Sequence, residues 1–288
     1  MRIAVVGARG QLAAAGIHEF AASGHDVVAL TREQLDVTDD AAVAAAIDRV
    51  RPDAIVNGAA WTDVDGAEDH PVEALNTNAY AVRALARAAA RYGAALVHYS
   101  TDFVFDGTAS APYTEEDRPN PRSVYAASKL LGEWFALDGP RAYVLRVESL
   151  FGQAPGARPA RGSAAGILET LRAGGAPKVF VDRTITPTFV LDAARATRQI
   201  LESQLPAGLY HCVNSGVCTW LGFAEELAHQ LGIEPRLVPV RMSDVPLRAS
   251  RPKYCALSNE KLRSVGIEMP SWQDALRRYI VSYAGVDR

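Results

Sequence analysis

The sequence has only three cysteines, and no apolar run approaches the roughly 18 residues that a membrane-spanning helix needs. Cys212, Cys218 and Cys255 are odd in number and lack C-x-x-C spacing, which argues against a disulfide framework or a structural zinc site. The formal net charge of -3 gives no electrostatic reason to expect nucleic acid or a membrane as partner. The N-terminus has no signal-peptide layout. We therefore expect a cytoplasmic globular protein, and we predict no metal site.

Strand and helix patterns alternate through the first half of the chain. Short β-branched apolar runs predict buried parallel strands, and helical segments separate them. This alternation is typical of a doubly wound parallel α/β sheet of the Rossmann type. We expect strands at 3–6, 26–30, 53–57, 95–100 and 143–147, and helices that end near 23 and span 71–92 and 123–137.

After residue 150 the elements become shorter and mixed, which predicts a smaller α+β domain packed on the first. We assign an NAD(P)-binding Rossmann domain to 1–150, with a return segment near 182–202. Residues 151–288 are assigned mainly to a substrate-binding domain. The cleft between two such domains is the usual place for a small-molecule site.

A glycine turn follows the first strand, and the next strand ends near an arginine. Gly7 and Gly10 allow backbone amides to approach a pyrophosphate at the start of a helix, although Ala13 stands where a third glycine is usual. Arg32 follows the second strand, where a guanidinium suits the 2′-phosphate of NADPH. The residues favour NADPH and also allow NADH. Asp36 could bond the adenine amino group or serve only as a turn aspartate.

Tyr125 and Lys129 are four residues apart in a predicted helix, so both side chains lie on one face. A nearby cation favours the phenolate, and we expect it to lower the pKa of Tyr125 into the range useful for proton transfer. Thr101 and Asp102 lie at the carboxyl end of the fourth strand, facing the same crevice. Together these four residues form a candidate site for acid–base chemistry.

These motifs, taken together, resemble the extended short-chain dehydrogenase/reductase superfamily and, within it, the dTDP-4-dehydrorhamnose reductase family. The resemblance spans nearly the whole chain, and its most specific part is the Ser-Thr-Asp-Phe-Val-Phe-Asp-Gly run that begins at Ser100. It also rests on the Gly7 turn, the Asn57-Gly-Ala-Ala-Trp-Thr-Asp run, Tyr125 with Lys129, and the Thr186-Pro-Thr run.

The resemblance implies reduction of a nucleotide-linked 4-keto-6-deoxysugar by NADPH, and it allows a homodimer. Tyr125 would protonate the C4 keto oxygen, Thr101 would hydrogen-bond that oxygen, and Lys129 would hold the nicotinamide ribose. Asp102 would contact the sugar, and Arg251 would meet the substrate diphosphate unless it is merely an exposed loop residue. The implied cofactor-binding residues are Gly7, Gly10, Gln11, Leu12, Arg32, Asp36, Val37, Ala59, Ala60, Trp61, Asn78, Tyr125 and Lys129.

Two positions bear on the choice of reaction. Ser149 stands where the reductases carry a tryptophan that meets the substrate, so the identity of the sugar is open. Phe103 stands where sugar-nucleotide dehydratases carry a glutamate, which disfavours dehydration. Two alternative functions remain open. The protein could be another sugar-nucleotide enzyme, an epimerase or a dehydratase, or it could be a non-catalytic NADP-binding regulatory subunit.

Overall fold

The computed structural model describes residues 1–160, 162–203 and 205–284, and it brings the short apolar runs together in one sheet. Six strands in the order β10-β5-β4-β3-β1-β2 pair in parallel throughout. Because β2 and β3 lie on opposite sides of β1, the winding reverses there, and such a reversal marks the edge where open α/β sheets bind ligands. The strands are β1 (Arg2–Val6), β2 (Asp26–Leu30), β3 (Ala54–Asn57), β4 (Ala95–Thr101), β5 (Ala142–Val147) and β10 (Gly208–His211).

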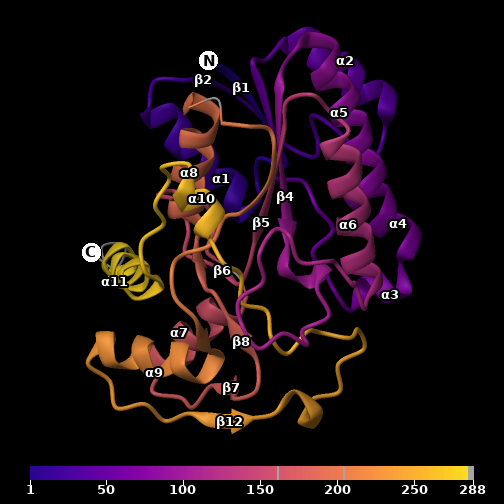
Figure 1. Cartoon of the computed structure of the whole chain (residues 1–288). Coiled ribbons are helices and arrows are strands. Elements are labelled where there is room, and N and C mark those ends of the chain that lie inside the picture. Colours follow the sequence, from indigo (N-terminus) through magenta and orange to yellow (C-terminus); the bar gives the residue numbers. More distant parts are fainter. Residues whose placement is uncertain (161, 204, 285–288) are drawn as a thin grey trace.

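Helices cover both faces of this sheet, and the doubly wound prediction is confirmed (Figure 1). On one face, α1 (Gln11–Ala22) and α8 (Val190–Ser203) pack together, and their apolar residues form one core with β1, β3 and β5. The other face carries α2 (Asp40–Val50), α5 (Ala81–Tyr92) and α6 (Val124–Leu137). The Asp39 side chain accepts hydrogen bonds from the amides of Ala41 and Ala42 and so caps α2.

The helix predicted over 71–92 is interrupted by a π-helical turn. It consists of α4 (Pro71–Leu75), the turn η1 (Asn76–Tyr80) and α5, and the short α3 (Gly66–Asp69) precedes it. The interrupted turn packs closely against α6. A Cβ atom at Gly132 would lie only 2.1 Å from the Asn78 carbonyl oxygen, so the widened turn fits against a glycine on α6.

A second region, at the carboxyl end of the sheet, has its own apolar core, which includes Phe151, Phe189, Phe223 and Trp272. It contains two-stranded pairs rather than a large sheet. Its principal elements are α7 (Ser163–Arg172), β7 (Lys178–Phe180), α9 (Trp220–Leu231), β12 (Val238–Val240) and α11 (Trp272–Ala284). Its shorter elements are β6 (Leu150–Phe151), β8 (Thr184–Ile185), β9 (Thr188–Phe189) and β11 (Cys218–Thr219).

The chain returns to the main sheet with α8 and β10, which pairs with β5. The return therefore continues beyond the predicted 182–202 segment. Two 3-10 turns, η2 (Asp102–Val104) and η3 (Met242–Asp244), and the short α10 (Glu260–Ser264) complete the elements used below. In the described part of the chain, no helix is long and apolar enough to cross a membrane.

Candidate active site

The glycine turn after β1 lies directly against the loop after β3. Gly7 has a φ of 71°, and a Cβ atom there would lie 2.6 Å from the Ala59 nitrogen, so only glycine fits. Ala13 is buried against Gly58, where an added Cβ would lie 2.7 Å from that of Ala13. The Ala13 methyl group therefore occupies the space that a side chain at Gly58 would otherwise take. The turn leads into the N-terminus of α1, as a dinucleotide site requires.

Other predicted cofactor residues surround this turn. The Gln11 side chain donates a 2.6 Å hydrogen bond to the Gly152 carbonyl, which ties the turn to the chain after β5. Leu12 and Val37 are buried in the cores on opposite faces of the sheet. Ala60 is exposed, and Gly10 also lies at the surface.

The Asp36 carboxylate accepts hydrogen bonds from the Thr38 hydroxyl at 2.7 Å and the Thr38 amide at 2.9 Å. These two bonds lower the pKa of Asp36. Oδ1 of Asp36 is therefore engaged within the turn, which supports the interpretation of Asp36 as a turn residue. Its second carboxylate oxygen is left for the adenine amino group. Arg32 is exposed just beyond the end of β2, where we expected it.

Asn78 lies behind the segment that we predict to bind the cofactor, rather than on its surface. Its side chain is fully buried, its Oδ1 accepts from the Trp61 amide at 2.9 Å, and its Nδ2 donates to the Trp61 carbonyl at 3.1 Å. The same Nδ2 donates to the Ser128 hydroxyl, which in turn donates to the Tyr125 carbonyl at 2.7 Å. Asn78 therefore links the Trp61 segment to the helix that carries Tyr125.

Thr101, Asp102 and Tyr125 meet at the carboxyl end of β4. The Thr101 hydroxyl donates to Asp102 Oδ1 at 2.9 Å. The Phe103 ring packs edge-on against the Tyr125 ring, with centroids 5.5 Å apart. The three predicted residues are therefore brought together, and Phe103 fills the position beside them with an apolar ring.

The predicted lowering of the Tyr125 pKa is wrong for this structure. Burial raises the pKa of Tyr125, the Asp102 carboxylate raises it further, and a contact with the Thr101 hydroxyl acts in the opposite sense. The cation that we expected to lower this pKa is directed elsewhere. Tyr125 is therefore a neutral phenol at neutral pH, and it has a proton to give.

Lys129 is 3% exposed, and its ammonium is directed at the backbone of β4. Its Nζ donates to the Tyr99 carbonyl at 2.6 Å and lies 3.4 Å from His98 Nε2. Burial lowers the pKa of Lys129 to about 8, and Glu133 opposes this effect. A lysine with such a pKa can take up or release a proton near neutral pH.

His98 is buried between Lys129 and Asn57. Burial lowers the pKa of His98 well below its ordinary value, and the Lys129 charge adds to the effect, so the ring is neutral. Asn57 Oδ1 accepts from the Ala59 amide, which turns Asn57 Nδ2 toward His98 Nδ1 at 3.1 Å. His98 is therefore a packed, neutral residue below Lys129.

Arg251 forms a two-pronged ion pair with Asp65. Its Nη1 and Nη2 lie 2.9 and 3.0 Å from the two carboxylate oxygens, and the Ala249 amide donates to Asp65 as well. Arg251 is thus partly buried and is not a plain exposed loop residue. It connects the C-terminal segment to the loop after β3, and its role toward a diphosphate stays a prediction.

The sequence analysis did not connect Glu148, Arg183 and Cys255 with the candidate site, although the structure brings them to Asp102. One ligand atom each from Asp102, Glu148 and Cys255 lies within 4.8 Å of the others, a spacing that could hold a metal ion. However, Arg183 Nη2 lies 3.9 Å from Asp102 Oδ2 and supplies positive charge there. The sequence signal that could have found this cluster is Glu148, an ionisable residue directly after the predicted strand 143–147 and next to Ser149.

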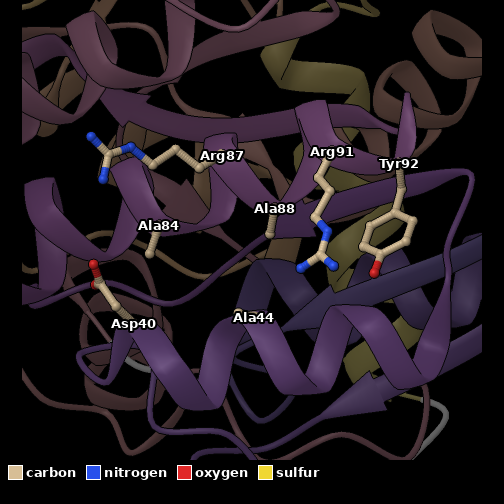
Figure 2. Close-up of a pocket in the computed structure, with 7 residues that line it drawn as sticks. All are labelled: Asp40, Ala44, Ala84, Arg87, Ala88, Arg91 and Tyr92. Atoms are coloured by element: carbon tan, nitrogen blue, oxygen red, sulfur yellow. The ribbon is translucent and has the colours of Figure 1, made fainter.

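Figure 2 shows a separate surface pocket between α2 and α5, lined by Asp40, Ala44, Ala84, Arg87, Ala88, Arg91 and Tyr92. None of the predicted site residues lines it. It combines exposed charged side chains with alanine methyl groups, and it supplies control positions for experiments at the candidate site.

Known proteins resemble this chain over almost its whole length. A dTDP-4-dehydrorhamnose reductase of Mycobacterium tuberculosis is 36% identical over 283 residues, covering 96% of this chain and 91% of the relative. A probable dTDP-4,6-dihydroxy-2-methyloxan-3-one 4-ketoreductase of Streptomyces antibioticus is 37% identical over 285 residues, covering 96% and 94%. A crystal structure of dTDP-4-dehydrorhamnose reductase from Bacillus anthracis in complex with NADP superimposes with a TM-score of 0.91 at 30% identity, covering 98% and 99%.

The model of the family described as RmlD substrate binding domain matches residues 1–284, almost the entire chain. This match confirms the resemblance that the motifs indicated. The chain therefore belongs to the RmlD substrate-binding-domain family, that of the dTDP-4-dehydrorhamnose reductases.

Proposed function

We propose that this protein is an NADPH-dependent reductase of a nucleotide-linked 4-keto-6-deoxysugar, with dTDP-4-dehydrorhamnose or a close relative as substrate. The observation that carries the proposal is the meeting of Thr101 and Tyr125 at the carboxyl end of β4, with buried Lys129 one turn further along α6. The glycine turn after β1 lies at the same edge of the parallel sheet. The names of the relatives from M. tuberculosis and S. antibioticus support the sugar-nucleotide substrate.

The site fits a dinucleotide on physical grounds. Gly7 packs directly against the Ala59 backbone, and α1 begins at Gln11 with no side chain capping its first amides, which leaves them available to a pyrophosphate. Arg32 would hold the 2′-phosphate, and the B. anthracis relative was solved with NADP. When bound, the reduced nicotinamide supplies the hydride. The cofactor-binding residues predicted from the sequence would line the bound dinucleotide. Asn78 would act indirectly, through its hydrogen bonds to the Trp61 backbone.

Tyr125 would donate its proton to the keto oxygen of the sugar. Its raised pKa keeps the phenol protonated until the oxygen gains negative charge. Thr101 would turn its hydroxyl hydrogen from Asp102 to the same oxygen, where the loss of one such donor costs about 10²-fold or more in rate. Lys129, one turn along α6 from Tyr125, would hold the nicotinamide ribose.

Dehydration is disfavoured by Phe103, which packs on Tyr125 where that reaction needs a further acid or base. The joint presence of Thr101, Tyr125 and Lys129 favours catalysis over a regulatory binding role. Ser149 leaves the sugar itself open between dTDP-4-dehydrorhamnose and related 4-ketosugars. The S. antibioticus relative, named for another 4-ketosugar, supports keeping that range open.

We further propose that the protein works in the cytoplasm as a homodimer. The reduced cysteines support that location, because all three are free. Trp134 and Leu137 are 62% and 39% exposed on α6, and Tyr80 is 42% exposed on the neighbouring turn η1. An exposed apolar surface of this kind is suited to contact with a second copy of the chain. The test is the molecular mass in solution, which should be that of a dimer for wild type and of a monomer for Trp134→Glu.

The direct test is NADPH oxidation with dTDP-4-dehydrorhamnose, compared between wild type and Tyr125→Phe. We expect kcat to fall at least about 10²-fold in the variant because the proton donor is lost. Tyr92→Phe, in the pocket of Figure 2, is the matched control and should keep wild-type turnover. If wild type reduces none of the 4-ketosugar nucleotides, the proposed reductase function is wrong. If wild type and Tyr125→Phe turn over equally fast, Tyr125 is not the proton donor.

A further inference from the structure

The helix that carries Tyr125 begins only one residue before it. Ser123 is the N-cap of α6, Val124 is its first helical residue, and Tyr125 is its second. The first amides of a helix have no partner within the helix, so a first turn frays unless other groups bind it. The position of the Tyr125 phenol therefore depends on what holds this turn in place.

A glutamate from a distant part of the chain binds the first amide of α6. Glu68 Oε1 accepts a hydrogen bond from the Val124 amide at 2.8 Å, and 56 positions of sequence separate the two residues. Both residues are partly buried, so water competes less for this bond than at an open surface. A carboxylate at this place also interacts favourably with the positive end of the helix dipole. Glu68 thus holds the start of α6 by a hydrogen bond and by charge.

The N-cap of the same turn makes a different kind of contact. The Ser123 hydroxyl accepts from the Ala126 amide at 3.2 Å. This bond closes the turn on itself, as N-cap residues do, and it does not connect the turn to another element. The Glu68 bond instead fixes the residue before Tyr125 to α3. The two contacts therefore differ in what they set: Ser123 sets the shape of the turn, and Glu68 sets its place in the molecule.

Glu68 can hold α6 because α3, the short helix that carries it, is itself held on other sides. Ala67 is fully buried. Asp65, directly before α3, forms the two-pronged ion pair with Arg251 described above. Figure 1 shows α3 near one end of α6, and the Glu68 bond places that contact at the start of α6. The α3 segment therefore joins the helix of Tyr125 to the C-terminal segment.

A second contact acts on the carboxyl side of Tyr125. The Ser128 hydroxyl donates to the Tyr125 carbonyl at 2.7 Å and accepts from Asn78 Nδ2 at 3.0 Å. The backbone on either side of the Tyr125 side chain is thus tied to a neighbouring element, to α3 before it and to η1 after it. A side chain in the first turn of a helix would otherwise share the fraying of that turn.

We propose that Glu68 is a positioning residue for Tyr125: through the Val124 amide it fixes the first turn of α6, and with it the place from which the phenol gives its proton. Glu68 acts on the chemical step rather than on binding, because it works through the backbone of α6. A misplacement of about 1 Å at a reacting group can cost about 10²-fold in rate. This inference rests on the proposed reductase function and adds one residue to it.

The bond from Val124 to Glu68 can be measured without substrate. Hydrogen exchange of the Val124 amide, followed by NMR on the full-length protein, should be about 10-fold faster in Glu68→Ala than in wild type, because one hydrogen bond is lost. Glu68→Gln should keep most of the protection, since the glutamine side-chain oxygen still accepts. Equal exchange rates in wild type and Glu68→Ala would overturn the proposal. This result is decided even if the reductase function fails.

The effect on Tyr125 is measured by steady-state kinetics with NADPH and dTDP-4-dehydrorhamnose. We expect kcat to fall about 10-fold in Glu68→Ala, while KM for both substrates stays close to the wild-type value. Glu68→Gln should recover most of kcat, because it keeps the acceptor for Val124. Glu73→Ala, at an exposed glutamate on the neighbouring α4, is the matched control and should behave as wild type. Wild-type kcat in Glu68→Ala would contradict the proposal.

Ser123→Ala separates the position of the turn from its stability. It removes one bond from the same turn but leaves the link to α3, so it should lower the urea midpoint much as Glu68→Ala does and lose clearly less kcat. Equal losses of kcat would show that helix stability alone matters, and the proposal would be wrong. It would also be wrong if NADPH binding to Glu68→Ala weakened as much as kcat fell. If wild type reduces no 4-ketosugar, the reductase function fails while the exchange result stands.

Discussion

The Lys129 ammonium lies 2.6 Å from the Tyr99 carbonyl oxygen in a place where its side chain is almost completely removed from water. Burial lowers the pKa of Lys129 from 10.5 to about 8. Between these pH values the unfolded chain binds more protons than the folded chain, so the free energy of unfolding rises with pH. Below about pH 8, where Lys129 is charged in the folded protein, burial of this charge lowers the free energy of unfolding by about 3 kcal/mol.

Lys129→Met should therefore be more stable than wild type at pH 7, although it should lose reductase activity. The lost hydrogen bond to Tyr99 offsets part of the gain, which leaves on the order of 1 kcal/mol. Urea unfolding at pH 7 and pH 10 measures this, and the advantage of the variant should shrink at pH 10. Lys178→Met, at an exposed lysine, is the control. A variant less stable than wild type at pH 7 would contradict the prediction.

Ala13 and Gly58 should behave as a coupled pair. Gly58→Ala places a Cβ atom 2.7 Å from that of Ala13, so we expect overpacking to destabilise the fold by about 1–3 kcal/mol and to weaken NADPH binding. In an Ala13→Gly background the same change should cost less, because the opposing methyl group is absent. Relief should be partial, since the Val6 carbonyl lies 3.2 Å from the added atom. Equal costs in both backgrounds would show that the two positions are independent.

Local patterns were sufficient to predict the sheet and the residues at its carboxyl edge. Apolar runs placed β1 to β5, and helical spacing placed Tyr125 and Lys129 on one face. The sequence did not indicate the π-helical turn at Asn78, which packs against a glycine on another helix. It also could not show that Lys129 is directed at Tyr99, or that Glu148 meets Asp102 and Arg183. Those contacts depend on how separate segments pack, and local pattern does not encode that.

Arg32 should discriminate NADPH from NADH. Loss of a charge-assisted hydrogen bond to the 2′-phosphate costs about 1.5–3 kcal/mol, so Arg32→Ala should lower the NADPH/NADH ratio of kcat/KM by about 10-fold or more. NADH turnover should change little, because NADH has no phosphate there. Arg87→Ala, at an exposed arginine in the pocket of Figure 2, controls for the loss of a surface charge. An unchanged ratio in Arg32→Ala would assign the discrimination to another residue.

The Arg251–Asp65 pair allows the two roles of Arg251 to be separated. If Arg251 meets the substrate diphosphate, Arg251→Ala should weaken dTDP binding about 10-fold, because a charged hydrogen-bond donor is lost. Asp65→Ala leaves that guanidinium without its 2.9 and 3.0 Å partners and free to meet the diphosphate. It should therefore bind dTDP at least as tightly as wild type. If Arg251 serves only to hold the C-terminal segment to the loop after β3, both variants should weaken dTDP binding to the same extent. Calorimetry with dTDP decides between these results, because the two roles predict opposite effects for Asp65→Ala.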